Sequence, residues 1–502
     1  MNVSELAGNE IKRFGEHVIL VFEDKEITNV EMDRWACRLA NGLKKLGVKR
    51  GDRVIIQMPN CPEVLQSFQA VWKIGAVVVP MNFLIGEEET NYIYQDSGAK
   101  TVISSMDFLP KIEAGMAKVP AIKNLMLIDK EVPPGALSYW HIVKENSEEI
   151  EMEKTGDDDI AALIYTAGTT GRPKGVMHSH YSLYSNAKMQ QDTVNLPPGL
   201  VSISVLPLCH SYGMATMNSG SLIGGGKLVL LNSFDVDKIF EAIETYKGNV
   251  MAGVPTMYVY MLLHPDPKKY DLSSMKYWIS GSAPLALDTW EGFKGKFGFE
   301  IIEGWGLTEA GANNSVNPLD GVKKIGSIGL PMKGTVIKVF DDDGNELPRG
   351  QEGEVAIKGP MLMKGYWNKP EETESVLREG WLYTGDVGYV DEDGYFFITD
   401  RKKDLIIKGG ENITPREIEE VIFTHPKVSE AAVIGIKDEV YGEDIKAFVV
   451  LKPGETATAE EIIEHCLKRL EKFKTPKEVE FLNALPKNLV GKVLKKELRK
   501  SG

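Results

Sequence analysis

Short apolar segments that alternate with amphipathic ones constrain the fold of this chain more than any other feature. The runs at 53–58 (RVIIQM), 76–81 (AVVVPM) and 101–105 (TVISS) are short and largely apolar, which is typical of buried strands. Between these runs, apolar residues recur at helical intervals. Another helical segment begins with a capping box at Thr28 and stops at Gly47. This alternation predicts an α/β fold whose parallel sheet is covered on both faces.

The same alternation returns after the polar stretch at 147–159 and predicts a second α/β layer. From about residue 325, short strands separated by turn signals indicate a small antiparallel β-subdomain. We predict a large body over 1–400 and a small α+β C-terminal domain over 401–502, with a hinge near 400–404. The strand-like runs that follow the polar stretch lie at 160–166, 201–207, 227–231, 249–254, 275–281 and 300–306.

The composition favours some binding partners and cellular compartments over others. The 502 residues carry a formal net charge of −14, which disfavours nucleic acid as a partner. The four cysteines are widely spaced, the longest apolar run (75–86) is too short to span a membrane, and the N-terminus lacks a signal-peptide core. These features predict a soluble cytoplasmic protein without a transmembrane segment. The region 401–502 carries 20 basic and 18 acidic residues, against 38 and 54 in the rest of the chain.

The strongest local signal is the loop YTAGTTGRPKG at 165–175, which overlaps the end of the predicted strand 160–166. Its three glycines and three threonines supply backbone N–H groups and hydroxyls that can surround phosphate oxygens, and Lys174 adds a positive charge. It is not the P-loop of NTPases, because that pattern requires a glycine where Pro173 stands. A plain glycine-rich turn would not need the hydroxyls and the lysine together, so we interpret the loop as a phosphate site.

The chain resembles the AMP-forming adenylating enzymes, a family that includes acyl-CoA synthetases, carrier-protein adenylation domains and beetle luciferases. The resemblance implies that a carboxylate attacks the α-phosphorus of ATP, giving an acyl-adenylate and pyrophosphate, and that the thiol of CoA then displaces AMP. It implies ATP, Mg²⁺, CoA as co-substrate and a small-molecule carboxylic acid. The motifs that carry it cover essentially the whole chain: YTAGTTGRPKG (165–175), PLCHSYG (207–213), GSAPL (281–285), EGWGLTE (303–309), YTGD (383–386), DRKKDLI (400–406), GGENI (409–413) and LVGK (489–492).

The resemblance also implies roles for residues around the nucleotide. The loop 166–175 would hold the β- and γ-phosphates, Asp386 would bind both ribose hydroxyls, and Trp305 would stack on adenine. Arg401 would reach the ribose or a phosphate, and Lys403 would be the point about which a mobile C-terminal domain rotates between half-reactions. The implied nucleotide, hinge and CoA residues are Thr166, Ala167, Gly168, Thr169, Thr170, Gly171, Lys174, Gly281, Ser282, Ala283, Glu303, Gly304, Trp305, Gly306, Asp386, Arg401, Lys403, Gly409 and Gly410.

Four residues take the catalytic roles that the resemblance implies. Lys492 would bridge the substrate carboxylate and the α-phosphate, where two anions must be brought together. Thr308 would contact the α-phosphate, and Glu309 would place Mg²⁺, a hard cation that prefers carboxylate and phosphate oxygens. His210 would steer the carboxylate of the acid as a hydrogen-bond donor.

The CoA side of the site departs from the family pattern. Gly409 and Gly410 would let the backbone approach the pantetheine arm of CoA closely. Ile407, however, stands where some relatives place a lysine for the second half-reaction. Val490 replaces the hydroxyl residue before Gly-Lys, and Ala167 replaces a frequent serine of the phosphate loop.

Two further readings of the motifs are weaker. His178 and His180 have the spacing of a metal pair on a strand, but no other ligand type lies near them in the sequence, so we interpret both as structural. An amino-acid-activating relative would need an acidic partner for the substrate ammonium, and the segment 210–220 contains none.

Two alternatives stay open within the same fold. One is an acyl-AMP ligase that loads a carrier protein instead of CoA. The other is a non-catalytic nucleotide-binding protein, which the presence of Glu309, Asp386 and Lys492 disfavours.

Gly306 motivates an expectation about substrate size. In the acetate-activating branch of the family, a tryptophan follows the adenine-stacking aromatic and closes the acyl pocket, whereas here Gly306 follows Trp305. An open pocket would favour medium-chain, alicyclic or aromatic acids, and Gly306→Trp would shift the preference toward acetate. The alternative is that Gly304 and Gly306 serve backbone geometry alone.

Overall fold

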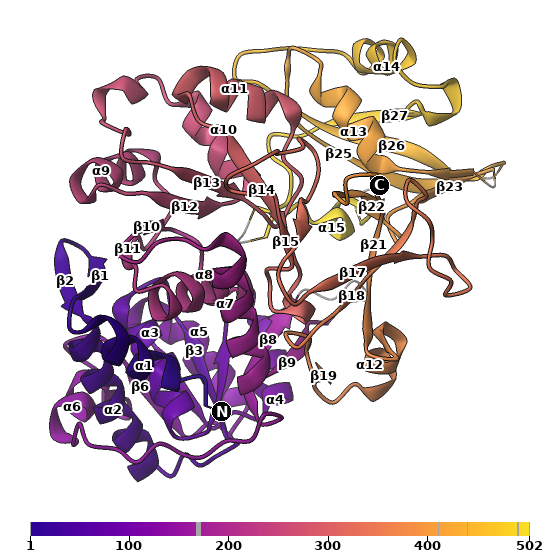
Figure 1. Cartoon of the computed structure of the whole chain (residues 1–502). Helices are drawn as coiled ribbons and strands as arrows, with labels where there is room; N and C mark the ends of the chain where they lie inside the picture. The colour runs from indigo at the N-terminus through magenta and orange to yellow at the C-terminus, as the bar shows by residue number, and fades with distance from the viewer. Residues whose placement is uncertain (1, 167–171, 410, 439, 489–490, 501–502) are drawn as a thin grey trace.

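The structure, a computed structural model, describes residues 2–166, 172–409, 411–438, 440–488 and 491–500. Within these ranges the chain forms four sheets: two large α/β sheets, a small antiparallel one, and the sheet of a C-terminal domain (Figure 1). The predicted fold class is confirmed.

The first sheet has a parallel centre, because β3, β4, β5, β6, β7 and β8 all pair in parallel. It has eight strands among the described residues, in the order β19 (Gly365–Tyr366), β9 (Lys174–Ser179), β8 (Ile160–Thr166), β4 (Val77–Pro80), β3 (Arg53–Gln57), β5 (Thr101–Ser104), β6 (Asn124–Leu127), β7 (Leu137–Ser138). Its helices are α2 (Asn29–Lys45), α3 (Pro62–Lys73), α4 (Glu87–Ser97), α5 (Leu109–Lys118) and α6 (Tyr139–Glu145). Strands 53–58, 76–81 and 101–105 are confirmed to within a residue or two.

The second sheet begins with a hairpin from the N-terminus, which is not among the strands that the sequence predicts. Its nine described strands run β16 (Leu330–Pro331), β15 (Ser315–Val316), β14 (Ile301–Trp305), β13 (Tyr277–Ser280), β12 (Val250–Gly253), β10 (Val201–Ser204), β11 (Lys227–Leu230), β1 (Val18–Phe22), β2 (Lys25–Thr28). The hairpin joins because β1 pairs in parallel with β11. The helices that follow the strands of this half are α7 (His180–Val194), α8 (Ser211–Met217), α9 (Val236–Tyr246), α10 (Pro255–Leu263) and α11 (Leu287–Phe297).

The third and fourth sheets follow one another along the chain. The third contains β17 (Val336–Phe340), β18 (Gly353–Lys358), β20 (Leu377–Arg378), β21 (Trp381–Val390) and β22 (Phe396–Arg401), with α12 (Pro370–Val376) beside it. The fourth contains β23 (Ile406–Lys408), β24 (Glu411–Ile413), β25 (Val428–Asp438), β26 (Gly442–Leu451) and β27 (Glu478–Phe481). Its helices are α13 (Pro415–Phe423), α14 (Ala459–Leu467) and α15 (Lys495–Leu498). Helix α14 ends at Leu467, and a 3-10 turn occupies Lys472–Lys474.

Local sequence explains several boundaries. The Thr28 hydroxyl accepts a hydrogen bond from the Glu31 N–H while the Glu31 carboxylate accepts one from the Thr28 N–H, so the predicted capping box starts α2. Gly47 has φ = +87°, a conformation that favours glycine and allows the chain to turn away. No helix in the described ranges is long and apolar enough to cross a membrane.

Candidate active site

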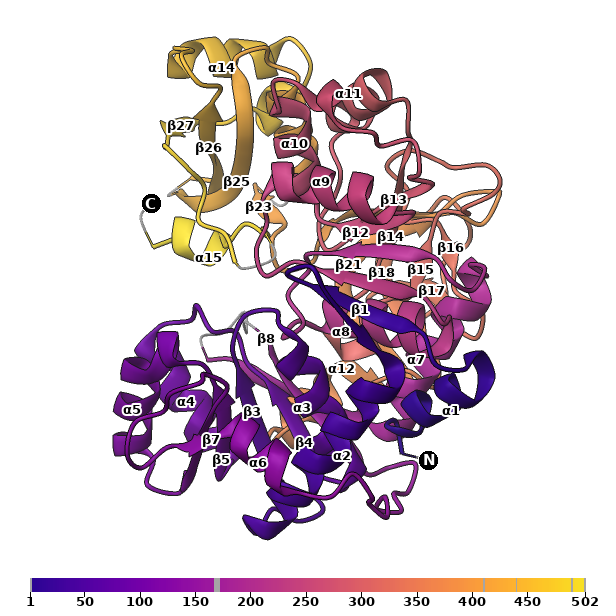
Figure 2. The same cartoon turned by 90° about the vertical axis from the view of Figure 1, so that its left-hand side faces the viewer.

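The loops that carry the predicted site lie where strands of the two large sheets end. The strands β8, β13 and β14 deliver Thr166, the segment 281–285 and Trp305 to one region, and ligands of open α/β sheets bind at such carboxyl ends. The helix α15 lies on the side of the C-terminal domain that is turned toward this region (Figure 1, Figure 2).

Asp386 on β21, the predicted ribose-binding residue, lies among side chains from other predicted site segments. It is 3% exposed, and its Oδ2 accepts a 3.0 Å hydrogen bond from the indole N–H of Trp305. Its Oδ1 lies 2.9 Å from Nε of Arg401, the residue opposite it on β22. The negative charge of Asp386 raises the pKa of Arg401. Each carboxylate oxygen keeps a further lone pair, so the pair of oxygens can still accept two hydroxyls.

Thr308 and Glu309 lie in a 3-10 turn that follows β14. The Thr308 hydroxyl shares a 3.0 Å hydrogen bond with Ser211, and its carbonyl accepts a 2.7 Å hydrogen bond from Nε2 of His178. Oε1 of Glu309 accepts a 2.9 Å hydrogen bond from the hydroxyl of Tyr366. Both residues are therefore held by side chains from distant parts of the sequence.

Glu309 has the donor chemistry that Mg²⁺ requires. Within the described ranges, no three His, Cys, Asp or Glu side chains gather as a metal site. Mg²⁺ is usually bound by one or two carboxylates together with substrate phosphates, so a single carboxylate beside the phosphate region fits that ion.

The two histidines of the possible metal pair are structural. His178, on β9, is fully buried. Burial lowers its pKa to about 4, so the ring is neutral near pH 7. Its Nδ1 accepts from the hydroxyl of Ser182 at 3.1 Å. His180 is the first residue of α7 instead of continuing the strand, and its Nδ1 accepts a 3.1 Å hydrogen bond from the N–H of Val3.

The phosphate loop is described only at its two ends. Lys174 pairs with Thr166 across β8 and β9, and its Nζ lies 2.5 Å from Oε2 of Glu372 on α12. The same ammonium lies 4.8 Å from the ring centroid of Tyr366. The remaining predicted loop residues lie outside the described residues: Ala167, Gly168, Thr169, Thr170 and Gly171.

The carboxylate of Glu303 is buried and accepts hydrogen bonds from two loops. Its Oε1 accepts from the N–H of Gly326 at 3.1 Å and its Oε2 from the N–H of Leu285 at 3.4 Å. Burial raises its pKa to about 7. Glu303 therefore ties β14 to the segment that follows Gly281.

The structure does not support the argument from Gly306 to the size of the acid, and a backbone contact is the reason. A Cβ at Gly306 would lie 1.7 Å from the carbonyl oxygen of Ala312, a distance no side chain can adopt. A Cβ at Gly304 would lie 3.1 Å from the carbonyl oxygen of Ser315. Both glycines thus permit close packing of the strand end against the chain that returns beside it, and Gly306 says nothing about the size of the acid.

His210 lies next to the segment Gly281, Ser282, Ala283. It caps α8, with its Nδ1 accepting a 3.3 Å hydrogen bond from the N–H of Tyr212, so the neutral ring carries its proton on Nε2. A Cβ at Gly281 would lie 3.3 Å from the Tyr212 ring, which brings the two loops together, and Ser282 has φ = +70°. Burial, with the positive charge of Lys492 as a second cause, lowers the pKa of His210 to about 4.

Lys492 reaches this site from the C-terminal domain. Its N–H donates a 2.8 Å hydrogen bond to Oδ1 of Asn488, and a Cβ on the preceding Gly491 would lie 3.2 Å from the hydroxyl of Thr256 at the start of α10. Desolvation, followed by the charge of Arg401, lowers the pKa of Lys492 to about 8. The lysine is therefore close enough to Arg401 and His210 for their charges to interact.

Of the remaining C-terminal residues, Lys403 lies close enough to this cluster for its charge to interact with those of Arg401, Asp386 and Lys492. Lys403 is exposed in the turn between β22 and β23. The N–H of Gly409 donates to the carbonyl of Tyr441 at 2.8 Å, a contact within the C-terminal domain, and Gly410 lies outside the described residues.

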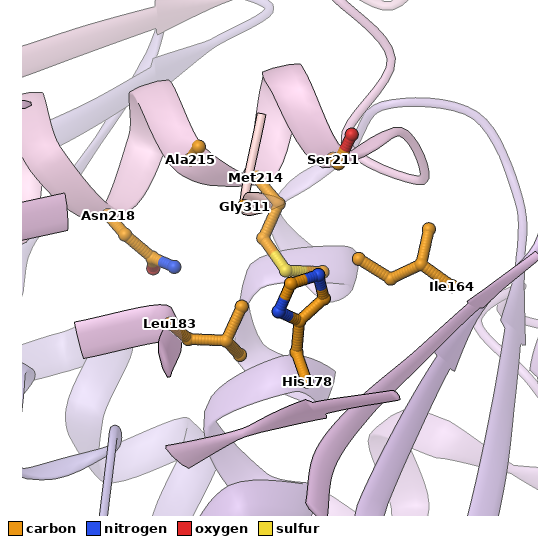
Figure 3. Close-up of a pocket in the computed structure, with 8 residues that line it drawn as sticks. All are labelled: Ile164, His178, Leu183, Ser211, Met214, Ala215, Asn218 and Gly311. Atoms are coloured by element: carbon orange, nitrogen blue, oxygen red, sulfur yellow. The ribbon is translucent and has the colours of Figure 1, made fainter. Parts of the chain in front are cut away.

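A small cavity lies behind the turn that holds Thr308. Figure 3 shows His178, Leu183, Ser211 and Met214 around it, with Asn218 at its edge. Its volume of about 10 Å³ is close to the space one water molecule needs and far below that of an acyl chain. Met214, 1% exposed, is therefore a core residue in this structure.

Three side chains that contact the site are not among the residues that the sequence analysis predicts for it. Ser211 binds Thr308, Tyr366 binds Glu309, and Glu372 binds Lys174. Ser211 directly follows His210, so its place in PLCHSYG is a local signal. Tyr366 and Glu372 lie outside all the motifs that carry the resemblance.

The chain matches two family profiles and is similar to curated proteins over most of its length. Residues 9–367 match the profile "AMP-binding enzyme", and residues 417–492 match "AMP-binding enzyme C-terminal domain". The chain is 36% identical to a long-chain-fatty-acid–CoA ligase of Bacillus subtilis (strain 168), over 97% of this chain and 92% of that protein. It is 37% identical to a feruloyl-CoA synthase of Amycolatopsis sp, over 94% of each.

The solved structures agree with these matches. ATP-bound MatB from Rhodopseudomonas palustris superposes with a TM-score of 0.92 at 36% identity, covering 100% of this chain and 99% of that one. Apo MatB gives a TM-score of 0.80 over the same coverage, at 35% identity. The arrangement of this chain is thus more similar to the ATP-bound form.

Proposed function

The chain belongs to the family of AMP-binding enzymes and is an acid–thiol ligase that uses ATP, and from that premise we propose how its own residues perform the reaction and which acids it takes. The proposed reaction joins a carboxylic acid to CoA through an acyl-adenylate. In the first step a carboxylate oxygen bonds to the α-phosphorus of ATP and the bond to pyrophosphate breaks. In the second step the thiol sulfur bonds to the acyl carbon and AMP leaves.

Each residue has a task that follows from its chemistry. His210, neutral with its proton on Nε2, donates to one oxygen of the incoming carboxylate and leaves the other free to attack. Lys492 supplies the positive charge that the α-phosphate needs as negative charge develops on it. Asp386 accepts the two ribose hydroxyls, and Trp305, whose indole is tied to Asp386, offers its face to adenine.

Mg²⁺ would be held by Glu309 together with the phosphates, whose charge it neutralises when bound. Lys174 and Thr166 would contact the β- and γ-phosphates. The polypeptide leaves the third sheet at Arg401 and enters the fourth at Ile406, so we place the hinge in between, with Lys403 inside it.

The proposed acid is larger than propionate: a medium-chain, alicyclic or aromatic acid. The support comes from the relatives, one named for long-chain fatty acids and one for feruloyl groups. Gly306 no longer contributes to this argument.

The observation that carries the proposal is the surroundings of Lys492. Its charge interacts with Arg401, with Asp386 and with His210. A lysine within range of both the proposed ribose carboxylate and the proposed acid-binding histidine can contact the α-phosphate and the carboxylate where the two must meet.

Pyrophosphate release tests the proposal across acetate, hexanoate, benzoate, cyclohexanecarboxylate and a long-chain acid, each with and without CoA. We expect pyrophosphate with the larger acids, and AMP release that requires CoA. Acetate as the best substrate would refute the acid class. AMP release that ignores CoA and requires a carrier protein would favour the acyl-AMP ligase instead.

A further inference from the structure

We propose that Tyr366 is a positioning residue that holds the metal-binding carboxylate of Glu309 and the phosphate-binding ammonium of Lys174 in one fixed arrangement. The inference rests on the roles of Glu309 and Lys174 in the proposed function. It assigns a task to a tyrosine that neither the motifs nor the resemblance singles out.

The hydroxyl of Tyr366 fixes Glu309. It donates a 2.9 Å hydrogen bond to Oε1, and hydrogen bonds to a charged acceptor are the stronger kind. With Oε1 occupied from one side, the carboxylate is held in one rotamer and its remaining lone pairs can bind a cation.

The ring of the same residue supports Lys174. The ammonium lies 4.8 Å from the ring centroid, within the range of a cation–π interaction. One side chain thus contacts both charged groups, the hydroxyl with the anion and the ring face with the cation. Glu372, 2.5 Å from the Lys174 ammonium, completes the arrangement from α12.

Tyr366 is itself rigid. It is 7% exposed and packs with Val176, Ala310 and Met363 in a buried cluster. Its strand β19 pairs with β9, where Tyr366 lies opposite Val176, two residues from Lys174. Its N–H donates a 2.9 Å hydrogen bond to the hydroxyl of Thr373. A side chain fixed in this way can orient groups that contact a metal, and loss of such a contact typically lowers metal affinity or activity about 10- to 100-fold.

Calorimetric titration of the full chain with ATP, in the absence of any acid, tests the inference with a readout that does not depend on turnover. For Tyr366→Phe, which keeps the ring and removes the hydroxyl, we expect ATP binding in the presence of Mg²⁺ to weaken about tenfold. Binding of ATP in EDTA should match the wild-type protein. For Tyr366→Leu, which also removes the ring, binding in EDTA should weaken as well.

Tyr139→Phe is the matched control. Tyr139 is fully buried and donates a 2.8 Å hydrogen bond to Gln66 in the core of the body, away from the site. It should lose thermal stability without any change in ATP binding. If Tyr366→Phe binds ATP within twofold of wild type at every Mg²⁺ concentration, the inference is wrong.

Glu309→Gln separates this failure from failure of the proposed function. If Glu309→Gln leaves the Mg²⁺ dependence of ATP binding unchanged, the metal role of Glu309 is wrong and the premise falls. If Glu309→Gln removes that dependence while Tyr366→Phe does not alter it, only the inference falls. The double variant should bind no more weakly than Glu309→Gln alone, because Tyr366 acts through Glu309.

Discussion

The two cations that meet at the junction of the body and the C-terminal domain are held in opposite ways. Arg401, at the end of a body strand, forms an ion pair with a buried carboxylate that raises its pKa. Lys492 is anchored through its backbone, and desolvation together with Arg401 lowers its pKa to about 8. The body side of the site is thus electrostatically satisfied, whereas the C-terminal side presents a cation that still lacks a full counter-charge.

This difference indicates a division of labour. A satisfied pair such as Arg401 and Asp386 fixes a binding surface before the nucleotide arrives. A cation with a lowered pKa gains stabilisation when an anion reaches it, and such groups concentrate at functional sites. The α-phosphate is the anion that the proposed reaction brings to Lys492.

Of the variants proposed, Lys492→Ala should have the largest effect. Loss of a donor that acts on charge developing at the α-phosphate costs on the order of 3–4 kcal/mol, so adenylate formation should fall about 10²- to 10³-fold. Thioester formation from a supplied acyl-adenylate should stay within a few-fold of wild type. Rapid-quench measurement of each half-reaction checks this, and an equal loss in both would contradict the role of Lys492.

A change on the body side should behave differently. Gly306→Ala forces a Cβ toward the carbonyl oxygen of Ala312, so we expect the free energy of unfolding to fall by about 1–3 kcal/mol or more. Both half-reactions should fall together, because the strand end that carries the site moves. Denaturant unfolding gives the first quantity and the two half-reaction assays give the second.

Gly295→Ala is the control for that variant. Gly295 lies in α11, and no atom lies within 4 Å of an added Cβ, so the free energy of unfolding should rise by about 0.5–1 kcal/mol. A stable, active Gly306→Ala would show that the backbone contact at Ala312 is unimportant.

Trp305→Phe tests the body side of the site, where Arg401 and Asp386 form an ion pair, and should have a smaller effect. It keeps an aromatic face and removes the N–H that donates to Asp386, a hydrogen bond to a charged group. ATP affinity should fall about tenfold, as about 1.5 kcal/mol implies. Trp290→Phe removes an N–H bond to the carbonyl of Ile301 in the core and should lower stability alone. Unchanged ATP affinity in Trp305→Phe, measured by calorimetry, would argue against the Trp305–Asp386 contact as part of the nucleotide site.

The last prediction is a pH dependence. Lys492 is protonated below its pKa of about 8 and neutral above it, so kcat/KM for adenylate formation should halve near pH 8 and then fall about tenfold per pH unit. The thioester step should lack this alkaline limb, and so should the residual adenylation by Lys492→Ala. A limb that persists in the variant belongs to another group.

The sequence by itself determined the elements and the loops between them. The capping box at Thr28 and the short apolar runs of β3 and β4 follow from interactions within a few residues, so they could be predicted from spacing. The motifs around Thr308, Asp386 and Lys492 are local patterns too, but their roles come from the resemblance to the family and not from spacing.

Only the tertiary structure decided what these residues touch. Tyr366 and Glu309 are 57 positions apart, Trp305 and Asp386 are 81 apart, and His178 and Thr308 are 130 apart. The N-terminal hairpin likewise joins the second sheet through β11, and Gly306 is required by a carbonyl six residues later that returns beside it. Such contacts depend on how sheets and turns pack in three dimensions, and spacing along one chain carries no record of that packing.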